Sequence, residues 1–420
     1  MSVGARAGRL LLIAAALAAS GPPAQARELW SEGDRSIALL TALKSTLLVT
    51  NAPTDPELYP EEVGAEGLWR LRLDLTGTPW TPISFGAAYE QRLVVASSAA
   101  GLVSGILPRN TPAPYRIWQL DWSIAQAPNL QWSQEIDRAY VALHLAPAEI
   151  TVGRQAIGWG RAVLFGAVDL FSPFNALEAD REWRRGVDAV RVDVRLAERF
   201  STEVVGAFGP DIGNSCFAGR LRGFAGDVDG ELVLGWRAQD LLAGFTTSTR
   251  LGGAAAHAEL AYFRLPAPLP PGAGGGRDVL KAVLGASYSF QVGNGLPVWL
   301  EYHYSGFGVK EPEQVIPTLA DPAYLKRYLR GDTQIIGQHV IALTANYEAS
   351  PEVTVGGLAL VSPVDGSGVV APNATWRPSD RVSLQAILYV PWGAKPTGLA
   401  LASVYGALPL SGYVQLAIFD

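Results

Sequence analysis

The sequence predicts an all-β fold, a transmembrane antiparallel β-barrel of about 14–16 strands with long extracellular loops. Apolar residues alternate with polar ones at a period of two, and short connections alternate with long ones. After the N-terminal region, no apolar run reaches the roughly 18 residues that a membrane-spanning helix needs. Yet 49% of the residues are hydrophobic and only 17% are charged. In a membrane, such a chain satisfies its backbone polar groups by closing into a barrel.

The N-terminus has the three parts of a secretory signal peptide. Arg6 and Arg9 form a positive region, residues 10–19 form a short apolar run, and Ala24-Gln25-Ala26 gives the small-x-small pattern of a cleavage site. The apolar run is too short to cross a bilayer as a helix. We therefore expect residues 1–26 to be a signal peptide, cut after Ala26, and the protein to be exported.

Residues 27–420 are then expected to form the barrel as one unit. Loss of Arg6 and Arg9 changes the formal charge from -6 to -8, since no acidic residue is lost with them. A mildly acidic chain argues against a nucleic-acid partner. Cys216 is the single cysteine, so the chain has no internal disulfide.

Strand faces follow from the period of two. In residues 69–75 every odd position is large and apolar and every even position is charged, as expected for lipid on one side and water on the other. The same pattern recurs around 190–196, 280–290, 298–305, 339–348 and 382–390. The residues expected to face lipid are Leu71, Leu73, Val192, Val194, Leu284, Leu300 and Leu384. Those expected to face the lumen are Arg70, Arg72, Asp74, Arg191, Asp193, Arg195, Lys281 and Glu301.

Two kinds of connection separate these strands. Tight turns marked by Pro, Asn or Asp are expected at the periplasmic end, at 145–149, 196–201, 293–297, 349–352 and 377–381. Long segments at 51–67, 97–114, 157–185, 265–278 and 307–338 suit extracellular loops or loops folded into a lumen. Within the last of them, helical spacing after Pro322 predicts a short helix over 321–330.

Aromatic residues gather near the ends of the predicted strands, where an interfacial girdle would use them. They are Trp69, Tyr89, Trp118, Trp122, Trp299, Trp376, Trp392, Tyr405 and Tyr413. The final segment, 412–420, is amphipathic and places Phe419 one residue before the end. It resembles the aromatic-terminated last strand that the barrel assembly machinery recognises, except that Asp420 follows the aromatic. Packing in a large β-sandwich is the alternative explanation of the alternation.

A more specific pattern spans 151–196. It consists of Gly153-Arg154-Gln155-Ala156-Ile157-Gly158-Trp159-Gly160, then Asp169-Leu170-Phe171-Ser172-Pro173, then Gly186-Val187-Asp188-Ala189. This pattern resembles a signature of porin-like outer-membrane proteins, G-R-Q-x-x-x-W-G, D-x-F-x-P and G-x-D-A. The resemblance covers some 45 residues and implies that the intervening loop helps to shape a pore.

The residues of that loop agree with a place inside the barrel. Gly158 and Gly160 allow the chain to leave its strand. Phe165 and Phe171 are apolar and need a surface to pack against, which the inner wall could supply. Both signs of charge follow, as a constriction that sorts polar solutes requires; a solvated surface loop is the alternative. The candidate pore residues are Arg154, Glu178, Asp180, Arg181, Glu182, Arg184 and Arg185.

The functional expectation is an outer-membrane channel for passive or selective passage of small polar solutes in a Gram-negative envelope. The four histidines, His144, His257, His303 and His339, lack metal-ligand spacing, and no haem-attachment, P-loop or nucleophile-elbow motif is present. We therefore expect no metal, no cofactor and no enzyme. The alternatives are a scaffold barrel that encloses a partner, such as a multihaem cytochrome or a polymer-export protein, and an outer-membrane enzyme. Expected partners are lipid, the assembly machinery and the solute, with a homo-oligomer or a periplasmic protein also possible on this sequence.

Overall fold

Long antiparallel strands make up most of the molecule. The computed structural model describes residues 26–420 except 56, 60, 98–105 and 109–112, so nearly all of the predicted signal peptide lies outside the described residues. The wall strands are β2 (Arg35–Asn51), β3 (Val63–Trp80), β4 (Ile83–Ala96), β6 (Leu130–Leu145), β7 (Ala148–Gln155), β8 (Val187–Ala197), β9 (Phe200–Ala207), β10 (Cys216–Ala225), β11 (Val228–Arg237), β12 (Asp240–Leu251), β13 (Ala254–Arg264), β14 (Asp278–Phe290), β15 (Leu296–Ser305), β16 (His339–Ser350), β17 (Val353–Val361), β18 (Gly368–Ser379), β19 (Val382–Trp392) and β20 (Leu410–Phe419).

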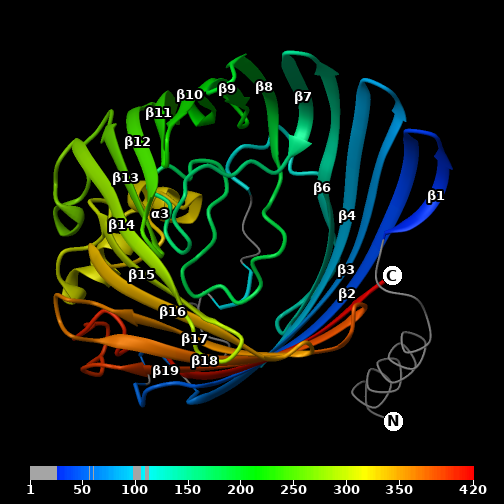
Figure 1. Ribbon diagram of the computed structural model, residues 1–420. Coiled ribbons are helices and arrows are strands. Elements are labelled where there is room, and N and C mark those ends of the chain that lie inside the picture. The colour runs from blue at the N-terminus through cyan, green and yellow to red at the C-terminus, as the bar shows by residue number, and fades with distance from the viewer. Residues whose placement is uncertain (1–25, 56, 60, 98–105, 109–112) are drawn as a thin grey trace, which may run out of the picture.

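These strands form a closed ring (Figure 1). β20 pairs with β19 on one side and with β2 on the other, from Ala42 opposite Phe419 to Asn51 opposite Leu410. Asp420 continues this pairing, because its backbone N–H donates to Thr41 O at 2.8 Å. The predicted antiparallel barrel is therefore confirmed.

The barrel has 18 strands in the described part of the chain, so the predicted count of about 14–16 was too low. Strands such as β13 and β17 carry alanines and glycines where a large apolar residue would mark the outer face. Small residues weaken the period-two signal, which depends on contrast between the two faces.

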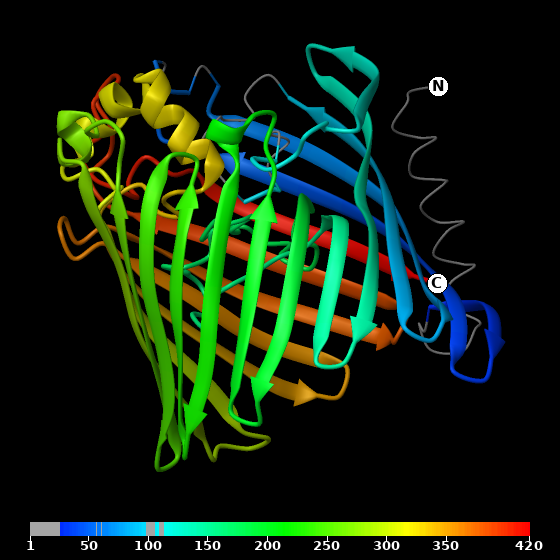
Figure 2. The same cartoon turned by 90° about the horizontal axis from the view of Figure 1, so that it is seen from above.

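Two further strands extend the sheet beyond the ring. β1 (Arg27–Glu32) pairs with residues 35–39 of β2, and β5 (Asp121–Ala127) pairs with residues 130–135 of β6. Figure 2 shows both hairpins protruding from the wall, β1 at the lower right and β5 at the top.

The two ends of the barrel differ. Tight turns join β3 to β4, β6 to β7, β8 to β9, β16 to β17 and β18 to β19 at one end. The long connections lie at the other end: 52–62, 97–120, 156–186, 265–277, 306–338 and 393–409. Short helices lie there too, namely η1 (Ile212–Asn214), η2 (Pro271–Ala273), η3 (Pro312–Gln314), α2 (Val315–Leu319) and α3 (Pro322–Arg330). As predicted, α3 begins after Asp321, whose side chain caps Ala323 N and Tyr324 N.

Alternate residues face outside and inside. On β14 and β15, Leu284 and Leu300 are 59% and 51% exposed, whereas Lys281 and Glu301 are 1% exposed. The outer face therefore presents a band of apolar side chains, and the charged ones lie within. Among the described residues, no helix is both long and apolar enough to cross a membrane.

The aromatic prediction holds only in part. Trp118, Trp122 and Trp376 are exposed, but Tyr405 and Tyr413 are buried. Tyr413 lies on the inner face of β20, since its neighbour Val414 is exposed, and Tyr405 belongs to the connection 393–409 rather than to a strand. These two tyrosines therefore do not contribute to an outer girdle.

Candidate functional site: the loop inside the barrel

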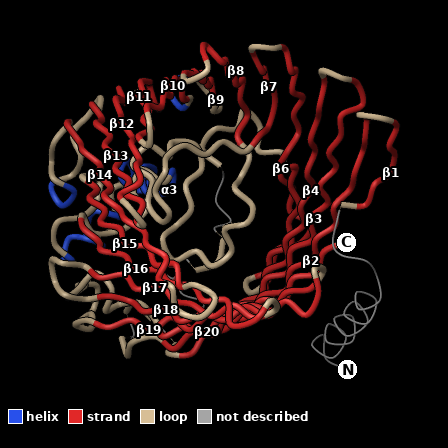
Figure 3. Tube along the Cα trace, viewed as in Figure 1, coloured by secondary structure: helices blue, strands red, loops and turns tan. Residues whose placement is uncertain are grey.

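The connection between β7 and β8, residues 156–186, runs inside the ring of strands (Figures 1 and 3). We call this segment the inner loop. It turns at Gly160, whose φ of +103° suits glycine. Its apolar side chains Phe165 and Phe171 are fully buried. Phe165 stacks on His303 of β15 with ring centroids 5.0 Å apart, so the wall supplies the surface that these residues need.

Two glutamates of the wall hold the far end of the inner loop. Glu259 on β13 accepts hydrogen bonds from Ala162 N at 2.9 Å and Ala167 N at 2.7 Å. Glu301 on β15 accepts one from Leu164 N at 3.0 Å. The backbone N–H groups of a loop inside a barrel have no strand partner and still require hydrogen-bond acceptors. Ionised carboxylates are strong acceptors. A Cβ at Gly160 would lie 2.8 Å from a Glu259 oxygen, so the glycine belongs to the same anchor.

The returning limb of the inner loop is held by cations of β2 and β3. Asp180 accepts from Lys44 Nζ at 2.8 Å and from Arg70 at 2.9 Å. Glu182 pairs with Lys44 at 2.6 Å. The ring of Trp183 lies 4.0 Å from Lys44 Nζ, within the range of a cation–π contact. Burial alone would raise the pKa of Asp180, but Lys44 and Arg70 outweigh it and hold that pKa below its usual value.

These contacts continue into an ion network along β3, β4 and β6. Arg70 and Arg72 both pair with Glu90, at 2.9 and 3.2 Å. Arg72 also reaches Asp137 at 2.9 Å. The predicted lumen residues Arg70 and Arg72 are thus placed inside the barrel, where they are paired and covered rather than open to water. Asp74 lies beside them, 2.7 Å from Arg72.

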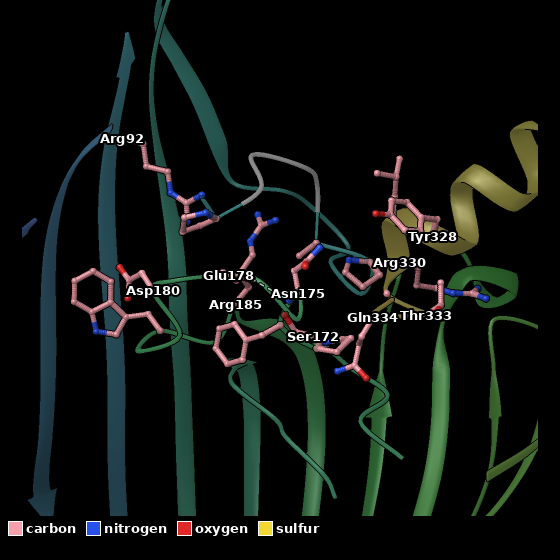
Figure 4. Close-up of a pocket in the computed structure, with 18 of the residues that line it drawn as sticks. Arg92, Ser172, Asn175, Glu178, Asp180, Arg185, Tyr328, Arg330, Thr333 and Gln334 are labelled. Atoms are coloured by element: carbon pink, nitrogen blue, oxygen red, sulfur yellow. Dashed lines mark hydrogen bonds between the residues drawn. The ribbon is translucent and has the colours of Figure 1, made fainter. Parts of the chain in front are cut away.

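A narrow cavity of about 90 Å³ lies between the inner loop, this wall and α3 (Figure 4). We call it the constriction. Its charged lining residues are Arg70, Arg92, Glu178, Asp180, Arg185 and Arg330, and its apolar ones include Pro108, Ala113, Pro114, Pro173, Phe174 and Leu329.

A second ion network fixes the α3 side. Asp332 pairs with Arg237 of β11 and with Arg330 of α3, and Arg327 pairs with Asp240 at 2.7 Å. Burial acts to raise the pKa of Asp332, but Arg237 and Arg330 outweigh it and hold that pKa well below the usual range. The helix is therefore tied to the β11–β12 corner, and its end borders the constriction.

The predicted pore residues divide into three groups, of which the first lies at the constriction. Glu178, Asp180 and Arg185 line the constriction, and Glu182 lies next to it on Lys44. Arg185 lies 3.5 Å from Glu135. Burial raises the pKa of Glu178 and lowers that of Arg185 to about 10.

Arg181 and Arg184 instead bind within the inner loop. Arg181 donates to Asn175 O at 2.8 Å and Ala176 O at 2.7 Å. Arg184 pairs with Asp169 at 2.8 Å. The acidic residues of the predicted cluster therefore do not neutralise its arginines one by one, because each sign finds other partners.

Arg154 lies apart from all of these. It pairs with Asp188 at 2.7 Å and donates to Gln119 O and Ile136 O, both at 2.8 Å. Asp188 shares a face of β8 with the exposed Val190, whereas Val187 and Ala189 are buried inside. Arg154 therefore joins β8 to the segment before β5 and is not among the residues that line the constriction, and its part in a pore stays a prediction.

Two of the remaining predicted lumen residues line a second and larger cavity, of about 630 Å³, at the tight-turn end, whereas Lys281 and Glu301 contact the inner loop instead. Asp193 and Arg195 of β8 line it, together with Arg161 of the inner loop. Arg191 lies close by, 3.2 Å from Glu203. We call this space the exit cavity.

Sequence reasoning missed Lys44, Trp183 and Glu259. A possible signal was present, since Lys44 and Glu259 are single charges within otherwise apolar strand segments. Which loop such a charge would meet was not readable from the sequence. Among the described residues, no group of three or more His, Cys, Asp or Glu could hold a metal ion.

No family model matches this chain, and no curated protein sequence matches it. Solved structures do. The chain superposes on OccAB3 of Acinetobacter baumannii with a TM-score of 0.54 and 10% identity, over 91% of this chain and 99% of that one. OccAB4 of the same organism gives 0.52 and 11%, over 91% and 97%. OccK8 (OprE) of Pseudomonas aeruginosa gives 0.52 and 8%, over 91% and 98%. At these identities the likeness establishes the fold, and the chain shares the barrel architecture of these porins.

Proposed function

We propose that this chain is an outer-membrane channel for small polar solutes and that the inner loop sets its narrowest point. One observation carries the proposal: residues 156–186 cross the lumen and are held to its wall by Glu259, Glu301 and Lys44. A closed barrel with an apolar outside suits a bilayer. A polar lumen narrowed by a fixed loop suits filtration of solutes.

The size and lining of the constriction support passage of small solutes rather than of polypeptide. The inner loop crosses the lumen and is anchored to its wall by Glu259, Glu301 and Lys44, so it occupies space that an enclosed partner protein would need. This favours a channel over the scaffold alternative. Most wall charges near the constriction are paired, so size and polarity would govern passage. Glu178 and Arg185, the half-buried loop charges of the lining, would then contribute to the ion preference.

As an outer-membrane channel, the chain would have to be exported and then assembled into the membrane. A signal peptide at 1–26 would deliver residues 27–420 to the envelope. The last strand closes the ring against β2 and would present Phe419 to the assembly machinery. The long connections would face the cell exterior and the tight turns the periplasm.

Unitary conductance in planar bilayers tests the proposal with purified full-length barrel. Wild type is expected to give discrete conductance steps. Glu259→Ala removes the acceptor of several loop N–H groups, so the loop should loosen and the steps should become severalfold larger. The matched control is Glu149→Ala, because Glu149 pairs with His144 near the β6–β7 turn and, among the described residues, makes no hydrogen bond or ion pair with the inner loop.

Heat-dependent electrophoretic mobility would confirm that both variants form barrels. Absence of any conductance in folded wild type would contradict the channel. Equal conductance in wild type and folded Glu259→Ala would contradict the role of the inner loop.

A further inference from the structure

The exit cavity differs in chemistry from the constriction. It lies on the inner wall of β8–β11 near the tight turns. Arg161 of the inner loop contributes to its lining and binds Asp229. The charged groups that line it are the cations Arg161, Arg195, Arg199 and Arg222 and the carboxylates Asp193, Glu198 and Asp229. Among these lining residues cations outnumber carboxylates, four to three, and Glu231 and Glu203 lie behind them, 3.2 Å from Arg161 and 3.8 Å from Arg222.

The carboxylates do not use up the donors of these arginines. Arg222 pairs with Asp193, and Arg161 pairs with Asp229 and, at 3.2 Å, with Glu231. Even so, the Nε atoms of Arg161 and Arg222 are buried without a hydrogen-bond acceptor among the described residues. Buried donors in native proteins nearly always have a partner, so two acceptor positions are unfilled here.

Arg195 adds a charge that is open to the lumen. It is exposed, and within the described residues its side chain makes no ion pair. Its place on β8, two residues from Asp193, puts it on the same inward face. Arginine presents a planar fork of donors that matches carboxylate and phosphate oxygens.

We propose that the exit cavity is an anion-binding site, in which Arg161, Arg195 and Arg222 hold the carboxylate or phosphate group of a solute that has passed the constriction. The inference rests on the proposed channel function and deepens it, since it assigns the solutes a negative charge. Arg161 belongs to the inner loop and Arg222 to the wall, so a bound anion would bridge the two. A low-dielectric wall strengthens such an attraction.

Binding of inorganic phosphate to the detergent-purified, full-length barrel tests the site directly, by calorimetry at low ionic strength. The variant is Arg195→Gln with Arg222→Gln. Loss of two charge-assisted contacts should weaken binding by about tenfold or more. The matched control is Arg377→Gln, an exposed arginine at the same end of the barrel on β18, which should bind as wild type does.

Phosphate block of chloride current in planar bilayers gives the second readout. Phosphate added at the periplasmic side should block wild type at lower concentration than phosphate added at the other side, and the double variant should lose this asymmetry. Equal binding and equal block in wild type and the double variant would overturn the site while leaving the channel intact. Phosphate binding that depends on Arg195 and Arg222 in a barrel that does not conduct would support the site and refute the channel.

Discussion

Two stretches of the inner wall carry similar charges but differ in how far these charges are exposed. On β3 and β4, Arg70 and Glu90 are 3% and 1% exposed. On β8 and β10, the side chains of Asp193 and Arg222 are 28% and 29% exposed. Both pairs lie on inward faces of amphipathic strands. The difference lies in what covers them, because the returning limb of the inner loop packs on the first wall and leaves the second one open.

Coverage changes what a charge can do. A buried ion pair loses its hydration, and only close partners offset this loss. Removing one partner therefore lowers the stability of the fold strongly. A half-exposed pair keeps much of its water and contributes little to stability. The covered wall therefore holds the inner loop, and the open wall remains available to a solute.

The largest expected effect is a difference in folding stability between substitutions on the covered wall and on the open wall. Glu90→Gln leaves Arg70, Arg72 and Arg92 with one acceptor group fewer in a buried site, which should cost about 3–5 kcal/mol. Asp193→Asn on the open wall should cost about 1 kcal/mol or less. Denaturant unfolding of both variants in detergent measures the difference, and equal losses would remove the distinction between the walls.

A second test compares the outer face with the open interior on one strand. Leu284→Arg places a charge on the apolar outside of β14 and should destabilise the barrel by about 2–4 kcal/mol. Ser287→Arg, three residues along the same strand and on the inward face, should be tolerated. The yield of folded barrel in lipid vesicles reports both, and similar yields would argue against a lipid-facing exterior.

A smaller effect concerns pH at the constriction. Burial raises the pKa of Glu178, so this carboxyl takes up a proton at a higher pH than an ordinary glutamate. As the pH falls, the constriction loses a negative charge and anion preference should increase. Reversal potentials under a salt gradient should show this trend in wild type and in Glu28→Gln, a control on the exposed strand β1 outside the ring. In Glu178→Gln, the preference should be anion-shifted already at neutral pH and vary less with pH.

The smallest effect is expected at Arg154. Its guanidinium binds Asp188 and backbone carbonyls on the outer side of the wall, so Arg154→Gln should leave the reversal potential unchanged. Arg185→Gln, which removes a cation from the constriction lining, should shift the potential toward cations. A shift of equal size in Arg154→Gln would contradict this expectation and indicate that Arg154 acts in the pore.

Local chemistry in the sequence was enough to predict several of the strands and turns. Alternation of Leu and Arg over 69–75 assigned both faces of β3, because side chains of a strand point in opposite directions at each step. Asp321 and Pro322 marked the start of α3, since both residues suit the first turn of a helix. The strand count was less accessible, because alanines and glycines on β13 and β17 reduce the contrast between faces.

Partners across the lumen were decided by the tertiary structure alone. The sequence determined that Asp180 and Arg184 are charged and that Phe165 needs an apolar surface. Only the closed barrel brought Asp180 to Lys44, 136 residues away, and Leu164 to Glu301, 137 residues away. The period of two specifies which face a residue occupies but carries no information about the segment on the opposite side of the ring. The position at which the inner loop packs against the wall therefore decided which inward-facing charges are buried and which are exposed to the lumen.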